Sequence, residues 1–281
     1  MPTPLSEALA TLRRRHGEAV IRSGDALGGI EAWPTGLPVL DHRLTPGGLP
    51  VGRVSILAAA SGASGRLTLL QALVAVASRE RTVVYLDLVG SLDPGFLADL
   101  GADLSALLVL RPPSGRWGEG FSMARSLVAA GAPWLAVALD SRSNAGWEHR
   151  LSTLVESVAA RRAVCLVSAA SPLPLALGYA SSLTLECVAD GWEEAHGDVL
   201  GLRTHLTVVK SKVSTPGETA ALLLRYPRPF AAAEAVGRPV VVDLTATRKV
   251  LEVTAVASDI PAVAGGGARG FAAAPRGGEP L

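Results

Sequence analysis

The chain is poor in the residues that build disulfide-stapled and metal-bearing proteins. Its 281 residues include 2 cysteines, and aromatic side chains make up 4% of the sequence. Cys165 and Cys187 each lie in a largely apolar run, so we interpret them as buried small side chains. We therefore expect neither a disulfide nor a metal site.

Long hydrophobic runs and targeting segments are also missing. The longest apolar stretch, residues 127–139, contains Gly131 and Pro133 and is too short to span a bilayer. The N-terminus lacks the apolar core of a signal peptide. We expect a soluble, cytoplasmic protein with no membrane partner.

An excess of charge of either sign is absent as well. The formal net charge is +1, so the overall balance demands no polyanionic partner. Lysine is scarce, because Lys210, Lys212 and Lys249 are the only lysines among 26 basic residues. Residues two apart in a strand share a face, so Lys210 and Lys212 form a candidate contact for an anion or a partner protein. The alternative is an inherited, solvated edge.

Short apolar runs alternate with helical stretches from residue 54 onward. Such alternation predicts right-handed crossovers and a mostly parallel central sheet flanked by helices, and the closely spaced later strands predict antiparallel edge strands. The fold class is α/β. Strands are predicted at residues 54–59, 83–88, 107–110, 135–139, 164–167, 183–188, 206–209, 220–225 and 240–243, with helices at 67–78, 118–130 and 147–160.

The composition divides the chain into three parts. Residues 1–29 are predicted to hold an N-terminal helix at 5–24 and a linker, and Leu5, Leu9 and Leu12 give this helix an apolar stripe. Residues 30–257 form the predicted core. Residues 258–281 are rich in Ala, Gly, Pro and Arg and read as a flexible tail, because they have too little apolar surface to bury.

The first core strand leads into a sequence similar to a Walker A phosphate loop, G-x-x-x-x-G-K-[ST]. Gly65 keeps the second glycine, but Ala60 replaces the first, Arg66 the lysine and Leu67 the metal-holding Ser/Thr. A planar guanidinium does not fit the space of an ammonium between phosphates, and a leucine offers a metal ion no oxygen. Thr68 replaces that hydroxyl only if the register slips by one residue. We expect no cofactor, and weak ATP binding is the alternative.

The residues around this loop, taken in order, resemble bacterial RecA. The resemblance extends from about residue 5 to about residue 245 and implies a RecA-like P-loop NTPase core. It rests on Pro34-Thr35-Gly36, Leu40-Asp41, Gly47-Gly48-Leu49-Pro50-x-Gly52-Arg53, Tyr85-Leu86-Asp87, Leu92-Asp93-Pro94, Leu100-Gly101-Ala102-Asp103, Leu139-Asp140-Ser141, Tyr179-Ala180-Ser181 and Val208-Val209-Lys210-Ser211-Lys212.

Several positions depart from the catalytic set of RecA. RecA has a catalytic glutamate two residues after the aspartate of the second core strand, where this chain has Val89. RecA ends the strand after Walker B in an Asn-Gln pair, where this chain has Ser168-Ala169. Asp140, at the Walker B position, is kept. Because a valine cannot orient or deprotonate water, we expect the chain not to be an enzyme.

The ligand surfaces of RecA are altered too. The segments that correspond to its DNA-binding loops are cut to residues 142–146 and 171–178, so we expect weak or no direct binding of single-stranded DNA. Gly178 replaces the phenylalanine by which RecA subunits lock together, which disfavours a RecA-type filament. Asp93 and Phe96 fall where RecA contacts adenine, so they mark a candidate adenine slot, with core packing as the alternative for Phe96.

Among RecA relatives, this combination of altered catalytic positions, short DNA loops and length resembles ImuA. That resemblance implies a non-catalytic adaptor of the bacterial DNA damage (SOS) response that supports error-prone translesion synthesis and mutagenesis. The expected partners are other repair proteins, namely an inactive Y-family-like polymerase, RecA or both. Three alternatives remain open: a modulator of RecA filaments, a SulA-like division inhibitor and an active RecA-paralogue ATPase.

Overall fold

The computed structural model describes residues 4–16, 31–60, 63–139, 147–195, 198–212, 214–227 and 240–242. The helices are α1 (Pro4–His16), α2 (Arg66–Ser78), α3 (Pro94–Asp99), α4 (Trp117–Ala129), α5 (Glu148–Arg161) and α6 (Leu175–Ala180), with a short π-helical turn η3 (Val39–Leu44) and a 3-10 turn η4 (Leu104–Ala106). The strands are β1 (Ala32–Trp33), β2 (Leu49–Pro50), β3 (Val54–Ala59), β4 (Val83–Asp87), β5 (Leu107–Leu110), β6 (Trp134–Ala138), β7 (Val164–Ala170), β8 (Ser181–Ala195), β9 (Asp198–Ser211), β10 (Thr219–Arg225) and β11 (Val240–Val242).

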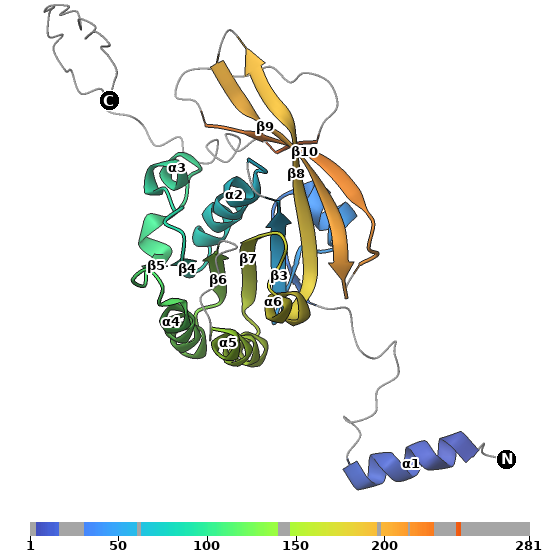
Figure 1. Ribbon diagram of the computed structural model, residues 1–281. Helices are drawn as coiled ribbons and strands as arrows, with labels where there is room; N and C mark the ends of the chain where they lie inside the picture. Colours follow the sequence, from blue (N-terminus) through green and yellow to red (C-terminus); the bar gives the residue numbers. More distant parts are fainter. Residues whose placement is uncertain are drawn as a thin grey trace, which may run out of the picture. The chain divides into compact units, whose positions relative to one another are not determined.

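The predicted α/β fold is confirmed. Nine strands form one sheet in the order β11-β10-β9-β8-β3-β7-β6-β4-β5 (Figure 1). The pairs from β8 through β3, β7, β6 and β4 to β5 are parallel, whereas β9 runs antiparallel to both β8 and β10. The antiparallel strands therefore lie toward one end of the sheet, as the short late connections predicted.

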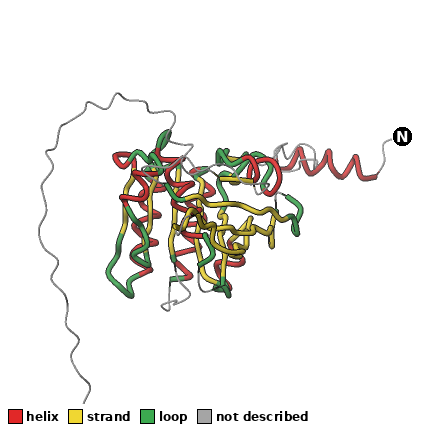
Figure 2. Tube along the Cα trace, turned by 90° about the horizontal axis from the view of Figure 1, so that it is seen from above, coloured by secondary structure: helices red, strands yellow, loops and turns green. Residues whose placement is uncertain are grey.

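Helices cover both faces of the parallel strands (Figure 1, Figure 2). Strand side chains that point to one face pack with α2 and α3, and those that point to the other pack with α4, α5 and α6. Because both faces of β3, β4, β6 and β7 are buried, these strands read in sequence as continuous apolar runs.

The strand predictions were too short at two places: the strand predicted at 164–167 extends to Ala170 as β7, and the next two strands were underestimated by more. The strands expected at 183–188 and 206–209 belong to a much longer hairpin, in which β8 has 15 residues and β9 has 14. Charged residues occupy the far half of this hairpin, so the apolar pattern ends long before the strands do. The N-terminal helix ends at His16, and residues 17–24 of its predicted span lie outside the described residues.

The structure explains two of the residues in the short motifs at 34–50, Asp41 and Gly48. The Asp41 carboxylate accepts hydrogen bonds from the backbone N of Thr35 at 2.9 Å, the Thr35 hydroxyl at 2.7 Å and the backbone N of Gly36 at 3.0 Å. Gly48 has φ +109°, and a Cβ there would lie 1.9 Å from the carbonyl oxygen of Trp33. The aspartate and the glycine thus fix the entry into the first core strand.

The chain divides into a unit of residues 1–250 and a unit of residues 251–281. The second unit, including the tail predicted at 258–281, lies outside the described residues, so the predicted division at 29/30 and 257/258 stays a prediction. No helix among the described residues is long and apolar enough to cross a membrane.

Candidate functional site

The loop between β3 and α2 packs closely against the antiparallel strands. Gly65 begins α2 in the left-handed conformation, with φ +77°. A Cβ at this position would lie 2.7 Å from Leu224 Cδ1 and 3.2 Å from Leu202 Cδ2. The Thr204 hydroxyl is 2.9 Å from the carbonyl oxygen of Ser64 and donates to it or to a neighbouring strand carbonyl. The second glycine of the loop is therefore required by packing as well as by backbone conformation.

Arg66, at the lysine position of the loop, reaches the sheet. Its Nη1 atom donates a hydrogen bond of 2.7 Å to Oγ of Ser168, which is fully buried near the end of β7. Two positions at which the sequence departs from RecA thus contact each other. The two residues are 102 positions apart in the sequence, and no sequence pattern indicates that they form a pair.

The other two loop positions also face the protein. Leu67 is partly buried and packs against the core on the α2 side of the sheet. The side chain of Thr68 is hydrogen bonded to the Tyr226 hydroxyl, and burial raises the pKa of that tyrosine. Ala60, at the position of the first glycine, directly follows β3 and is exposed.

A cavity of about 170 Å³ lies beside the loop. Its walls are residues 63–68 together with Trp192, Leu202 and Tyr226. Phe96, one of the two predicted adenine-slot residues, is partly buried, and its ring packs edge-to-face on Tyr226 with centroids 6.4 Å apart. Trp192 and Tyr226 could not be predicted as part of this site, because only the fold of the sheet brings β8 and the end of β10 next to the loop.

The fit of this site to a magnesium nucleotide is mixed. The start of α2 and the aromatic pair suit a phosphate and a base, respectively. Leu67 supplies no oxygen for the metal, Arg66 is directed to Ser168, and the cavity is smaller than the roughly 300–1,000 Å³ typical of ligand pockets. The residues present therefore do not fit a complete magnesium nucleotide.

Asp93, the second predicted adenine-slot residue, caps α3. Its Oδ1 accepts hydrogen bonds from the backbone N of Gly95 at 2.8 Å and of Phe96 at 3.1 Å. This is the usual role of an aspartate at a helix N-cap. Phe96 therefore lies beside the loop cavity through its contact with Tyr226. One carboxylate oxygen of Asp93 is already hydrogen bonded to the backbone of its own helix.

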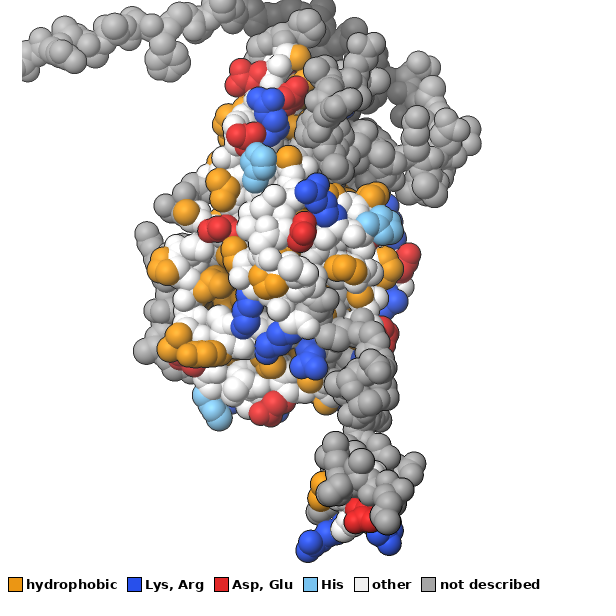
Figure 3. All heavy atoms as spheres, turned by 90° about the vertical axis from the view of Figure 1, so that its right-hand side faces the viewer, with side chains coloured by type: hydrophobic (Ala, Val, Ile, Leu, Met, Phe, Trp, Pro, Cys, Tyr) orange, Lys and Arg blue, Asp and Glu red, His pale blue; other side chains and the backbone are white. Residues whose placement is uncertain are grey.

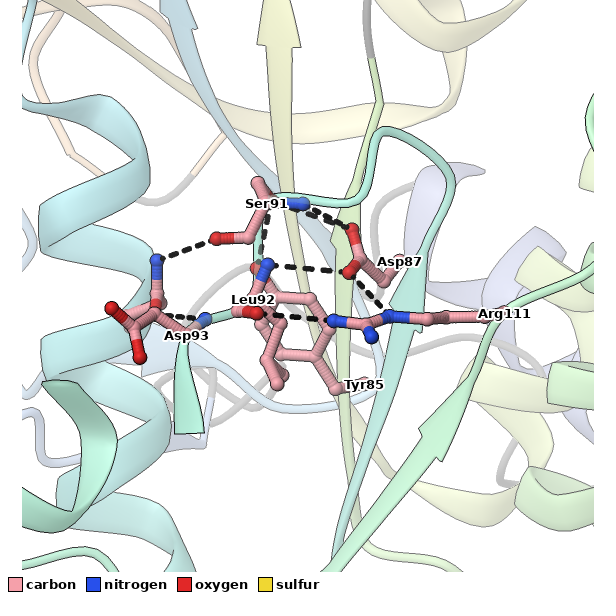
Figure 4. A network of polar contacts seen from close by, with 7 residues as sticks. Tyr85, Asp87, Ser91, Leu92, Asp93 and Arg111 are labelled. Carbon is pink, nitrogen blue, oxygen red and sulfur yellow. Dashed lines mark hydrogen bonds and ion pairs between the residues drawn. The ribbon is translucent and has the colours of Figure 1, made fainter. Parts of the chain in front are cut away.

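A polar network closes the segment that follows β4 (Figure 4). The buried carboxylate of Asp87 accepts hydrogen bonds from the backbone N of Ser91 at 2.9 Å, the backbone N of Leu92 at 3.2 Å and Nε of Arg111 at 3.0 Å. Arg111 also donates from Nη2 to the carbonyl oxygen of Leu92 at 3.0 Å. Gln71 of α2 contacts the same segment through the Ser91 carbonyl, at 3.3 Å.

Val89 lies inside this closed segment, with 38% of its surface exposed. The segment is held by Asp87 on one side and by α2 on the other, so Val89 is presented to solvent and not to the core. Asp140, the remaining catalytic position of the sequence analysis, lies outside the described residues.

Lys210 takes part in the structure of the neighbouring turn. Its Nζ donates to the carbonyl oxygen of Gly178 at 2.6 Å and lies 3.2 Å from Ser181 Oγ. Desolvation and the nearby charge of Lys212 lower the pKa of Lys210. Lys212 is exposed, and its backbone N donates to the Ser182 carbonyl. The predicted anion or partner contact of these two lysines stays a prediction.

The sequence pattern of the RecA N-terminal domain matches residues 3–147, which is just over half of the chain. The chain belongs to the RecA family. It is 30% identical over 260 residues to Protein RecA of Chlorobaculum tepidum, covering 79% of this chain and 74% of that protein. It is 29% identical over 258 residues to Protein RecA of Lactobacillus acidophilus, covering 79% and 70%. Protein RecA of Thioalkalivibrio sulfidiphilus is 29% identical over 259 residues, with coverage of 79% and 75%.

These relatives correct one expectation. The chain was expected not to be an enzyme, but the proteins it matches are named RecA, the family whose ATP-hydrolysing site served for the comparison above. That expectation is contradicted. The substitutions at Arg66, Leu67 and Val89 are differences within an ATPase family. The chain is a RecA-like protein of DNA repair.

Proposed function

We propose that this RecA-family chain is an adaptor of the bacterial DNA damage response that supports error-prone translesion synthesis, as its resemblance to ImuA implies. Its partners are other repair proteins, an inactive Y-family-like polymerase first among them. The observation that carries the proposal is the outer face of α6. Leu175 and Tyr179 lie one helical turn apart there and are 74% and 75% exposed, more than the other large hydrophobic side chains of the described residues.

Contacts with the core and with β8 and β9 hold α6 in place. Leu177 is fully buried, and the Ser181 hydroxyl donates to the Gly178 carbonyl at 2.9 Å. Lys210 donates to the same carbonyl from β9. A rigid turn that presents two large apolar side chains to water is typical of a protein-contact surface. Contact with a partner does not depend on ATP turnover.

The test measures partner binding by the full chain. Covering Leu175 or Tyr179 recovers about 1–2 kcal/mol each, so L175S and Y179S should each weaken binding by roughly 5- to 30-fold. The binding partner is the purified inactive Y-family-like polymerase, with purified RecA measured in parallel. Met123→Ser, on the exposed surface of α4, is the control and should bind like the natural chain.

Each variant is first compared with the natural chain by thermal melting. If the natural chain binds neither protein, the adaptor role is wrong. If L175S and Y179S bind as tightly as M123S, the α6 face is not the contact. Binding to RecA alone would support the filament-modulator alternative instead.

A second candidate function, an active ATPase paralogue of RecA, is favoured by the family match and by the aromatic pair of Phe96 and Tyr226 beside the loop. ATP hydrolysis with and without single-stranded DNA distinguishes it. On the face drawn in Figure 3, basic, acidic and hydrophobic side chains are interspersed. We therefore expect DNA binding to be weak and to fall steeply as salt is raised.

A further inference from the structure

The loop between β3 and α2 begins in the middle of the sheet. Strand β3, which leads into it, has β7 as one neighbour and β8 as the other, and β9 and β10 follow beyond β8 (Figure 1). The strands β3 and β7 end side by side, with Ala59 opposite Ala170, whereas β8 continues past this point to Ala195. Side chains of the loop therefore have strands within reach on both sides.

On one side the loop is joined to β7 by a charged hydrogen bond. Nη1 of Arg66 donates to Oγ of Ser168 at 2.7 Å, and Ser168 is fully buried. A hydrogen bond with an ionised donor is roughly twice as strong as a neutral one. If the guanidinium turned toward another acceptor, the Ser168 hydroxyl would lose this donor at a place where water does not easily replace it. The free-energy balance therefore favours keeping Arg66 on Ser168.

On the other side the loop is joined to β9 and β10. The hydroxyl of Thr204, a buried residue of β9, lies 2.9 Å from the carbonyl oxygen of Ser64. Gly65 comes so close to β10 that a Cβ there would lie 2.7 Å from Cδ1 of Leu224. Three consecutive residues of the loop, 64–66, are thus held by side chains from three different strands.

These contacts use the positions through which a phosphate loop holds its nucleotide. In that motif the lysine contacts the phosphates, and the hydroxyl of the next residue contacts a magnesium ion. Here Arg66 is bonded to the sheet, and Leu67 packs against the core on the α2 side. The side chains at both positions are therefore engaged by the protein itself.

We infer that this loop is a permanent link across the sheet, which joins β7 to β9 and β10 and keeps its conformation without a nucleotide. Arg66 is the part of the link that reaches β7, and Ser64 and Gly65 are the parts that meet β9 and β10. The inference follows from the misfit between the loop and a magnesium nucleotide. It is independent of the adaptor proposal.

Hydrogen exchange of the full chain, followed by mass spectrometry, tests the inference at the start of α2. The amide of Leu69 donates to the Gly65 carbonyl at 2.8 Å, so a peptide that covers the first turns of α2 reports whether the loop stays formed. In Ser168→Ala and in Arg66→Ala this peptide should exchange at least about fivefold faster than in the natural chain, because each variant removes a charged hydrogen bond. In the natural chain, MgATP at about 5 mM should leave the exchange unchanged, whereas a nucleotide that ordered the loop with even about millimolar affinity would slow it.

Two matched variants control for unspecific loosening. Ser55→Ala removes a buried hydroxyl from the neighbouring strand β3, and this hydroxyl has no hydrogen-bond partner among the described residues. Arg79→Ala removes an arginine at the other end of α2, whose Nη2 donates to the Leu100 carbonyl at 2.6 Å. Both variants should leave the exchange at the start of α2 as it is in the natural chain.

Three results would overturn the inference. The first is an S168A variant that exchanges like the natural chain at the start of α2. The second is an acceleration in S55A or R79A as large as that in S168A. The third is a slower exchange of the natural chain in the presence of MgATP. Each variant is first compared with the natural chain by thermal melting, and if R66A does not fold, S168A alone decides, because it removes only a hydroxyl.

Discussion

Replacing Asp87 by alanine removes the acceptor on which the segment after β4 depends. The carboxylate is fully buried and receives hydrogen bonds from two backbone amides, those of Ser91 and Leu92, and from Nε of Arg111. In D87A the amide of Leu92, a buried residue, loses its acceptor where water does not easily replace it. We expect the free energy of unfolding to fall and the segment of residues 88–93 to loosen.

The expected fall in the free energy of unfolding can be worked out from the donors that lose Asp87 as their acceptor. An orphaned buried donor costs about 1–3 kcal/mol, which applies in full to Leu92 and in part to the half-buried Ser91. Arg111 is half-exposed, so its ion pair adds no more than about 1 kcal/mol after screening by solvent. D87A should therefore lower the free energy of unfolding by about 3–4 kcal/mol. R111A should lower it less, by about 1.5–3 kcal/mol, because both backbone amides keep their acceptor although the buried carboxylate loses its cation and the Leu92 carbonyl loses a donor.

Urea unfolding of the full chain, followed by far-UV circular dichroism, measures both values, and the double variant D87A/R111A completes the cycle. The losses of D87A and R111A should sum to more than the loss of the double variant, because each single variant already removes the ion pair. The reasoning fails if D87A costs less than about 1 kcal/mol, or if R111A costs as much as D87A.

Two further predictions concern backbone and buried thiols. Gly48→Ala should lower the free energy of unfolding by at least about 3 kcal/mol, because its Cβ would collide with the Trp33 carbonyl. Gly90→Ala is the control: φ is positive there but the space is open, so the loss should be about 1 kcal/mol. Equal losses for the two variants in urea titrations would contradict this. Burial raises the pKa of Cys165 and Cys187 from 9.0 to about 12, so their contribution to stability is complete below pH 9 and is lost between pH 9 and 12. In the native protein neither thiol should react with a thiol reagent at pH 8, and labelling before unfolding would refute this.

The parallel core could be predicted from the sequence because strands buried on both faces are apolar throughout. The runs that became β3, β4, β5, β6 and β7 were each located to within a few residues. The long hairpin of β8 and β9 was not, because its outer half is solvated and follows no apolar pattern. Its length is set by cross-strand hydrogen bonds, which leave no mark in a single strand's sequence.

Individual residues of the candidate site could be predicted from the sequence, but the contacts between them could not. Sequence order identified the loop at Gly65 and Arg66 and the aspartate Asp87, since each follows an apolar strand. The network partner of Asp87, Arg111, follows a different strand, and no sequence pattern indicated that the two side chains meet.

The sequence by itself determined the family and the order of the core elements, because both depend on residue types at short spacings. Only the tertiary structure decided which groups meet at the loop. Arg66 donates to Ser168, 102 residues away, and Tyr226 from the end of β10 meets Phe96 of α3. Each contact joins a helix residue to a residue in or just after a strand far away in the chain, so it depends on how the helices pack on the sheet and on the order of the strands. Local patterns carry no information on such geometry, since it arises only when the strands pair.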